Sequence, residues 1–236
     1  MSSILESIEW GKPALELVQQ AWELDLNAPA FMHIRHSERP PVSAGLNLPL
    51  TDRGVKAAYE FGRNLPLDRK YYLYHTNIDR NQMTAENMQK GILDRKGVSK
   101  IMGEIPVATI IDAEENASLM MRAFEGKEEA GGARTHFYRW LSGLYPPWVR
   151  KPSLEFAQQG AFLMMKNLRE AEPDDLHVWV SHETWIAAFL MHWLGEFSFD
   201  WISYMDGFIL QFHEGYMMSF FRGEKKEVKY PYWWNF

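Results

Sequence analysis

The sequence predicts an α/β fold, in which a mostly parallel sheet is flanked by helices on both faces and carries an inserted cap. Three observations support this fold class. Short apolar runs rich in aromatic and β-branched residues recur along the 236-residue chain, each run ends in polar residues, and helical patterns follow three of the runs. Such alternation is typical of a parallel sheet covered on both faces, and the length fits a single domain with an insertion.

Four short apolar runs are the predicted strands. Their length and their aromatic and β-branched content favour strands over helices. The strands comprise residues 31–34, 71–74, 178–180 and, as a fourth candidate, 107–111.

A helix is expected after each of the first three of these strands. The first helix starts at a Thr51 or Asp52 N-cap and stops before Pro66. The second covers residues 78–92 and has a narrow apolar stripe. The third, over residues 185–194, is apolar on nearly all sides, as in a buried helix.

Two further segments lie outside this alternation. Residues 93–152 include several glycines and prolines and are expected to form a cap around the fourth strand. The tail, residues 230–236, is too apolar to extend freely into water. We expect it to dock on the body of the protein or on a second subunit, so a homo-oligomer stays an open alternative.

Composition excludes several classes of protein. The chain has no cysteine, which excludes disulfides, thiol nucleophiles and cysteine-ligated metals. The net charge of −6 argues against a nucleic-acid or anionic-membrane partner. The longest apolar run, residues 185–195, is shorter than the roughly 18 residues of a membrane helix. The opening residues lack the pattern of a signal peptide, so a cytoplasmic protein is expected.

Polar residues follow the predicted strands. Parallel strands place their carboxyl ends on one edge of the sheet, and ligands bind just outside that edge. The residues expected there are Arg35, His36, His75, His182 and Glu183.

The most informative segment is Arg-His-Ser-Glu-Arg-Pro-Pro, residues 35–41. A histidine between two arginines is a poor metal site, because fixed cations repel a metal ion, but arginine forks fit phosphate oxygens. The positive charge also keeps His36 neutral and nucleophilic. The alternative is that Arg35 and Arg39 pair with carboxylates such as Glu38.

Four segments in order resemble the histidine phosphatase superfamily, which includes the phosphoglycerate mutase and acid phosphatase relatives. The likeness spans roughly residues 30 to 190, and four motifs in order are more specific than any one. The segments are residues 35–41, similar to Arg-His-Gly-x-Arg-x-Pro; residues 50–54, similar to Leu-Thr-x-x-Gly; residues 75–85, similar to Ser-x-x-x-Arg-x-x-x-Thr-Ala; and residues 180–183, similar to the strand that ends in the family's second histidine.

The resemblance implies a phosphoglycerate mutase-like fold and a phosphatase that hydrolyses phosphate monoesters without a cofactor. His36 would attack phosphorus and become phosphohistidine. Arg35, Arg39, Arg80 and His182 would surround the phosphoryl group and stabilise its charge. The expected partner is a small phosphorylated substrate. By itself, His182 could equally be a core histidine at a strand end.

The sequence departs from the family pattern at two places. Ser37 replaces a glycine, and its hydroxyl has either the loop or the phosphate as a partner. Glu183 stands where the acid-phosphatase branch carries aspartate, which makes it the first candidate for the general acid. Glu114 and Glu115 are the rival acids, or else solvated loop carboxylates.

Three other functions stay open at this point. The first is a phosphoglycerate mutase-like phosphoryl transferase, which shields phosphohistidine from water. The second is a non-catalytic protein of the same fold that binds a phosphorylated ligand. The third is a metal-dependent hydrolase that uses His33, His36, Glu38, His182 and Glu183.

Overall fold

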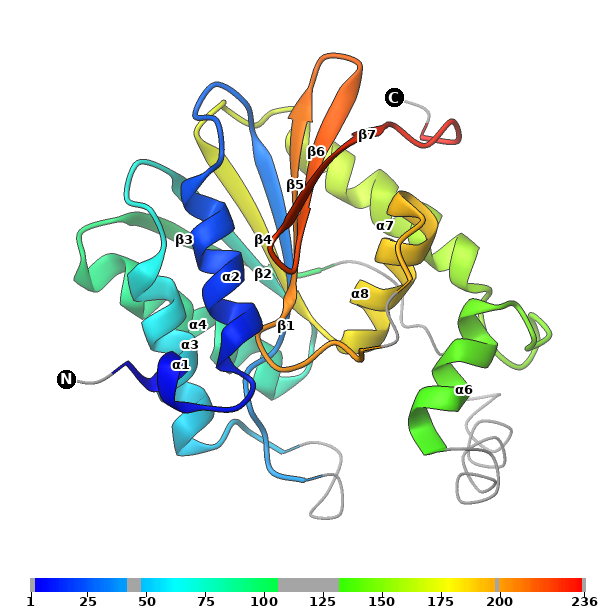
Figure 1. Ribbon diagram of the computed structural model, residues 1–236, viewed down its shortest axis with the longest axis horizontal. Coiled ribbons are helices and arrows are strands. Elements are labelled where there is room, and N and C mark those ends of the chain that lie inside the picture. The colour runs from blue at the N-terminus through cyan, green and yellow to red at the C-terminus, as the bar shows by residue number, and fades with distance from the viewer. Residues whose placement is uncertain (1–2, 42–47, 106–131, 198–199, 235–236) are drawn as a thin grey trace. The chain divides into compact units, whose positions relative to one another are not determined.

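The computed structural model describes residues 3–41, 48–105, 132–197 and 200–234. Its central feature is a seven-stranded sheet with strand order β3-β2-β4-β1-β5-β6-β7 (Figure 1). The strands are β1 (Ala30–Arg35), β2 (Lys70–His75), β3 (Val98–Glu104), β4 (Asp175–Ser181), β5 (Gly207–His213), β6 (Tyr216–Phe221) and β7 (Glu224–Lys229).

One half of the sheet is parallel and the other is antiparallel. β4 pairs in parallel with β1 and β2, and β2 pairs in parallel with β3. β5 runs antiparallel to β1, and β6 and β7 continue this antiparallel half. The predicted α/β class is therefore confirmed. The antiparallel strands were not predicted, because no helical pattern follows them and a tight turn at Gly215 joins β5 to β6.

The register of the parallel strands fixes where their carboxyl ends lie. Arg35, the last residue of β1, pairs with Ser181 of β4, and His75 of β2 pairs with Val180. The residues that follow these three strands therefore leave the sheet at the same edge. This edge is the one that the sequence predicts for the functional site.

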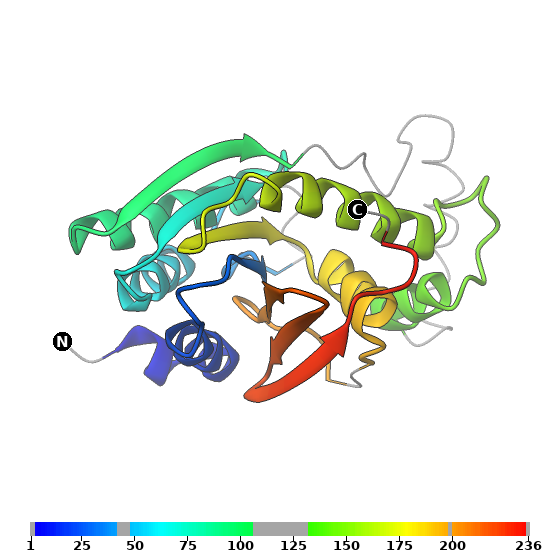
Figure 2. The ribbon, with the colours of Figure 1, turned by 90° about the horizontal axis from the view of Figure 1, so that it is seen from above.

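Four helices from the first half of the chain accompany the sheet. They share one hydrophobic core with alternate residues of the strands, such as Met32, Leu73 and Val178, which points to packing on one face of the sheet. Figure 2 shows these helices beside the strands. The helices are α1 (Ile4–Ser7), α2 (Gly11–Trp22), α3 (Asp52–Asn64) and α4 (Asp79–Asp94).

The predicted second and third helices agree with the structure in different degrees. α4 matches the expected helix over residues 78–92 closely. The expected helix over residues 185–194 is instead two elements: α8 (Glu183–Phe189) and a π-helical turn, Leu190–Leu194, which ends at Gly195 with φ of 66°. A π-helical turn adds a residue that a regular helical period does not anticipate.

The chain divides into two compact units. The first comprises residues 1–105, 166–186 and 202–230, and it contains the whole sheet with α1 to α4. The second comprises residues 106–165, 187–201 and 231–236, and it contains α6 (Gly132–Leu141) and most of α7 (Ser153–Leu168).

The second unit has an aromatic core of its own. Phe156 stacks on Phe189, which in turn stacks on Trp193 with ring centroids 4.0 Å apart. Trp234 packs edge-on against Trp193, so this part of the tail docks within its own unit. Self-association stays a prediction.

The boundaries of the expected insertion differ from the structure at its start. Residues 98–104 belong to the sheet as β3, at its edge. Their alternating exposed and half-buried side chains give them no continuous apolar run, which is why the sequence does not reveal them as a strand. The candidate strand 107–111 lies outside the described residues.

No helix within the described ranges is long and apolar enough to cross a membrane.

Two glycines let α3 and α4 approach closely. A Cβ atom added to Gly91 would lie 2.1 Å from the carbonyl oxygen of Tyr59 on α3. A Cβ atom added to Gly62 would lie 2.0 Å from the carbonyl oxygen of Met88 on α4. Both clashes are with backbone atoms, which cannot move aside by a change of side-chain rotamer.

We predict that Gly91→Ala destabilises the protein although alanine favours helix formation. The overpacking cost, about 1–3 kcal/mol, is expected to exceed the gain in helix propensity. Urea denaturation measures the free energy of unfolding. The exposed Lys90→Ala on the same helix is the control, and equal stability of the two variants would contradict the close approach.

Candidate functional site

His36 lies directly after β1 and is almost completely buried. Its backbone N–H donates to the carbonyl of Ser181 at 3.0 Å. Its ring Nδ1 lies 2.7 Å from the carbonyl oxygen of Ser37, which can only accept, so Nδ1 carries the proton. Nε2 receives a hydrogen bond of 3.1 Å from Nε of Arg80, which can only donate. The imidazole is therefore neutral, with its lone pair on Nε2.

The electrostatic surroundings keep the ring in this state. Burial lowers the pKa of His36 well below 6.5, and the charge of Arg35 and the neighbouring His182 lower it further. A neutral imidazole at neutral pH is the form that can act as a nucleophile.

Arg35 is the last residue of β1 and connects three parts of the site. Its Nε lies 3.0 Å from a carboxylate oxygen of Glu183. One terminal nitrogen donates to the carbonyl of Ile202 at 2.8 Å, and the guanidinium lies over the ring of Tyr204, 4.5 Å from its centroid. These contacts hold the guanidinium beside His36.

Arg80 and Arg39 add two more positive charges. Arg80 comes from the first turn of α4, and besides its bond to His36 it approaches Nδ1 of His182 to 3.5 Å. Burial lowers the pKa of Arg80, and the charge of Arg39 lowers it further. Arg39 donates to the carbonyl of Pro40, and its buried Nε has no hydrogen-bond partner among the residues described.

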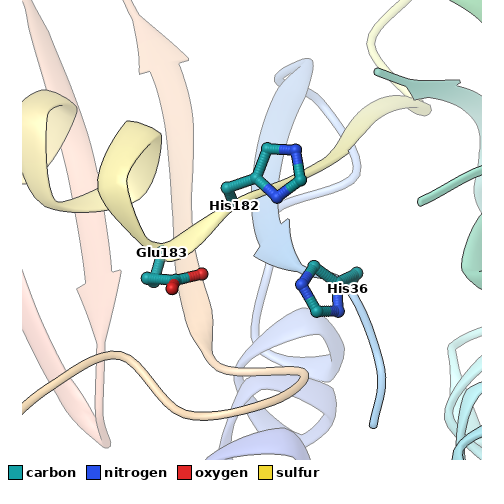
Figure 3. Close-up of side chains that lie close together, drawn as sticks. All are labelled: His36, His182 and Glu183. Atoms are coloured by element: carbon teal, nitrogen blue, oxygen red, sulfur yellow. The ribbon is translucent and has the colours of Figure 1, made fainter. Parts of the chain in front are cut away.

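His182 and Glu183 follow β4 and complete the group (Figure 3). The rings of His36 and His182 are 5.6 Å apart and nearly perpendicular, and the Glu183 carboxylate points towards them. Burial lowers the pKa of His182 to about 4, with the charge of Arg80 as the next cause. Five of the side chains predicted for the site lie in one cluster. They are Arg35, His36, Arg80, His182 and Glu183.

Glu38 and Ser37 hold the loop in place. Glu38 forms an ion pair with Arg53 and accepts a hydrogen bond of 2.6 Å from the Thr51 hydroxyl. The Arg53 contact, opposed by burial, lowers the pKa of Glu38. The hydroxyl of Ser37 donates to the carbonyl of Gly54 at 2.7 Å, so its partner is the start of α3. The sequence left open that Arg35 and Arg39 pair with carboxylates such as Glu38. Glu38 pairs with Arg53 instead, whereas Arg35 does pair with a carboxylate, that of Glu183.

The donor set for a metal ion is only partly assembled. Ligand atoms of His36, His182 and Glu183 lie within 4.8 Å of one another. His33 instead contacts the Ser181 hydroxyl at 2.5 Å, and Glu38 is paired with Arg53. Arginine nitrogens already contact the three clustered groups, so a metal ion would have to approach against fixed positive charge. The arrangement suits an anion better than a cation.

Sequence reasoning missed Tyr204, which forms a wall of the site. Its ring packs against Arg35 and lies 5.8 Å from the ring of His36. The loop that carries it is braced by Asp206, which accepts a 2.8 Å hydrogen bond from Arg222 on the turn after β6. Tyr204 stands in no motif, and its only sequence signal is the following Asp-Gly turn.

Glu114 and Glu115, the rival acids, lie outside the described residues.

No protein-family model and no curated protein matches the sequence. The fold matches solved structures. Phosphoglycerate mutase from Bacillus anthracis str. Sterne matches with a TM-score of 0.53 and 14% identity, over 87% of this chain and 94% of the mutase. A mycobacterial glucosyl-3-phosphoglycerate phosphatase, solved with VO3, matches with a TM-score of 0.53 and 17% identity, over 85% of this chain and 98% of that chain.

A structure titled mycobacterial hydrolase 1 also matches with a TM-score of 0.53, at 16% identity, over 86% of this chain and 98% of that chain. These likenesses show that the chain has a phosphoglycerate mutase-like fold, as the sequence resemblance implied.

We predict that the protein loses stability as the pH falls from 6.5 towards 4, in part through His182. The unfolded chain binds a proton at this residue below about pH 6.5, whereas the folded protein does so only near pH 4. The free energy of unfolding should therefore fall by about 1.4 kcal/mol per pH unit for each such histidine. Urea denaturation from pH 7 to pH 5 measures this slope. His182→Gln should reduce it, and an unchanged slope would contradict the depressed pKa.

Proposed function

We propose that this protein is a phosphatase of the histidine phosphatase superfamily that hydrolyses small phosphate monoesters through a phosphohistidine at His36. The observation that carries the proposal is the buried, neutral His36, whose Nε2 lone pair lies beside the arginine groups. Similarity to a phosphatase and to a mutase, both enzymes whose substrates carry phosphate, supports phosphoryl transfer as the chemistry.

In the first step, Nε2 of His36 attacks phosphorus and the bond to the ester oxygen breaks. Arg35, Arg39 and Arg80 stabilise the charge on the three equatorial oxygens, because preorganised donors need no rearrangement as the charge spreads. In the second step, water attacks the phosphorus of phosphohistidine, the nitrogen–phosphorus bond breaks, and inorganic phosphate leaves. Neither step needs a cofactor or a metal ion.

Glu183 is the general acid in this mechanism. The departing alkoxide must gain a proton, and the Glu183 carboxyl points towards the two histidine rings. Without substrate, the carboxylate is paired with Arg35 at 3.0 Å. A bound phosphoryl group competes for the same guanidinium, so substrate binding would release the Glu183 carboxylate. The released carboxylate would take up a proton from solvent, give it to the leaving oxygen, and in the second step take a proton from the attacking water.

The partner in this proposal is a small phosphorylated molecule, and we propose neither a nucleic acid nor a membrane surface as a ligand. Screening a panel of phosphate monoesters would identify the alcohol portion of the substrate. A cytoplasmic location stays a prediction of the sequence.

We predict that His36→Ala lowers kcat for p-nitrophenyl phosphate by about 1,000-fold or more, because the nucleophile is lost. His213→Ala, a histidine at the end of β5, is the matched control. Phosphohistidine should be trapped in the wild type by alkaline quench and be missing from the variant. Retained turnover in His36→Ala would show that His36 is not the nucleophile.

The same assay separates the alternatives. A chelator should leave the rate unchanged, whereas a metal-dependent hydrolase would lose activity. Transfer of the phosphoryl group to an added alcohol in preference to water would identify a mutase. Stabilisation by phosphate against heat without any turnover would identify a binding protein.

We predict that Glu183→Gln affects substrates according to their leaving groups. General acid catalysis contributes about 10²–10⁴-fold, and a poor leaving group depends on it more than p-nitrophenolate does. The kcat for an alkyl phosphate should therefore fall at least about tenfold more than the kcat for p-nitrophenyl phosphate. An equal loss on both substrates would assign the acid to another group.

A further inference from the structure

The ring nitrogen of His182 that points away from Arg80 is held by two buried polar residues. The amide nitrogen of Asn81 lies 3.0 Å from Nε2 of His182, and the Thr76 hydroxyl lies 3.4 Å from the same atom. The Asn81 amide nitrogen also donates to the Thr76 hydroxyl. Asn81 is completely buried, and Thr76 is nearly so. The proposed mechanism assigns neither residue a role.

The orientation of the Asn81 amide follows from counting its donors and acceptors. As placed, both N–H groups have partners, His182 and Thr76, and only Oδ1 lacks one among the described residues. The opposite orientation would point Oδ1 at both partners and leave two buried N–H donors unpaired. An unpaired buried donor is rarer and more costly than an unsatisfied carbonyl oxygen. The amide therefore donates to His182.

This orientation determines which nitrogen of His182 carries the proton. A neutral imidazole has one N–H group, and the ring that accepts at Nε2 must carry its proton on Nδ1. Nδ1 is the atom that lies 3.5 Å from a terminal nitrogen of Arg80. That contact is then one between two donors. A ligand oxygen atom that accepts a hydrogen bond from both groups would give each of these two donors an acceptor.

We propose that Asn81 is a positioning residue that fixes His182 as the Nδ1–H tautomer, so that His182 and Arg80 act as a pair of donors to one oxygen of a bound phosphoryl group. The tautomer itself follows from the contacts of Asn81 and Thr76 with His182, and the identity of the bound anion rests on the proposed function.

The first test is the tautomer of the wild-type protein. Nitrogen NMR of protein labelled in its histidines distinguishes a protonated ring nitrogen from an unprotonated one, and His182→Gln assigns the signals. We expect a protonated Nδ1 and an unprotonated Nε2 for His182 at pH 7. A protonated Nε2 would overturn the proposal, whatever the activity of the protein.

The second test reverses the hydrogen bond. Asn81→Asp presents a carboxylate of nearly the same shape that accepts from Nε2–H, which turns the Nδ1 lone pair towards the phosphoryl site. We expect the reversed tautomer by NMR and a loss of about 10- to 100-fold in affinity for inorganic phosphate and in kcat/KM, the size of effect seen for residues that orient metal-ligating histidines. Asn87→Asp is the control, because the amide of Asn87 donates to Met83 within the same helix.

The outcomes separate this proposal from the proposed function. An Asn81→Asp variant that keeps both the wild-type tautomer and the wild-type phosphate affinity would overturn the role of Asn81. A wild-type protein that hydrolyses no phosphate ester would overturn the function, while the NMR and phosphate titrations still test Asn81. Should Asn81→Asp not fold, the wild-type spectrum decides the tautomer.

Discussion

The site depends on one physical constraint: a neutral imidazole has to be held in the middle of fixed positive charge. Burial of His36, followed by the charges of Arg35 and Arg80, lowers the pKa of its ring and disfavours protonation. The same charges that keep this imidazole neutral also attract an anion and stabilise charge on its oxygens. The positive charges therefore disfavour protonation of His36 and favour binding of an anion, and Glu183 pairs with Arg35 while no anion is bound.

The fold meets this constraint by bringing remote segments to one edge of the sheet. The parallel pairing of β1 with β4 sets Arg35 opposite Ser181, so that His36 and His182 leave the sheet side by side. Arg80, in the first turn of α4, reaches the same edge and contacts both histidines there. The antiparallel half contributes through Tyr204, whose loop Asp206 and Arg222 brace.

Ser37 and Asn81 show which features of the site could not be predicted from the sequence. The motif around His36 predicted a neutral histidine beside Arg35 and Arg39, because residue type and short spacing are enough to suggest a phosphate site. Ser37 could not be assigned, since a hydroxyl bonds equally well to a loop or to phosphate, and only the position of the Gly54 carbonyl decided between them. Asn81 lay within the same segment as Arg80 yet gave no signal, because its partner His182 is 101 residues away in the chain.

The sequence by itself determined the α/β class, the strands that end in polar residues, and the histidines and arginines of the site. Those features are local: periodicity, residue type and short spacings carry them. Tertiary structure alone decided the antiparallel half of the sheet, the place of β3, the pairing of Glu38 with Arg53, and the wall formed by Tyr204. These depend on contacts between residues far apart in the chain, and many local patterns are compatible with more than one such contact.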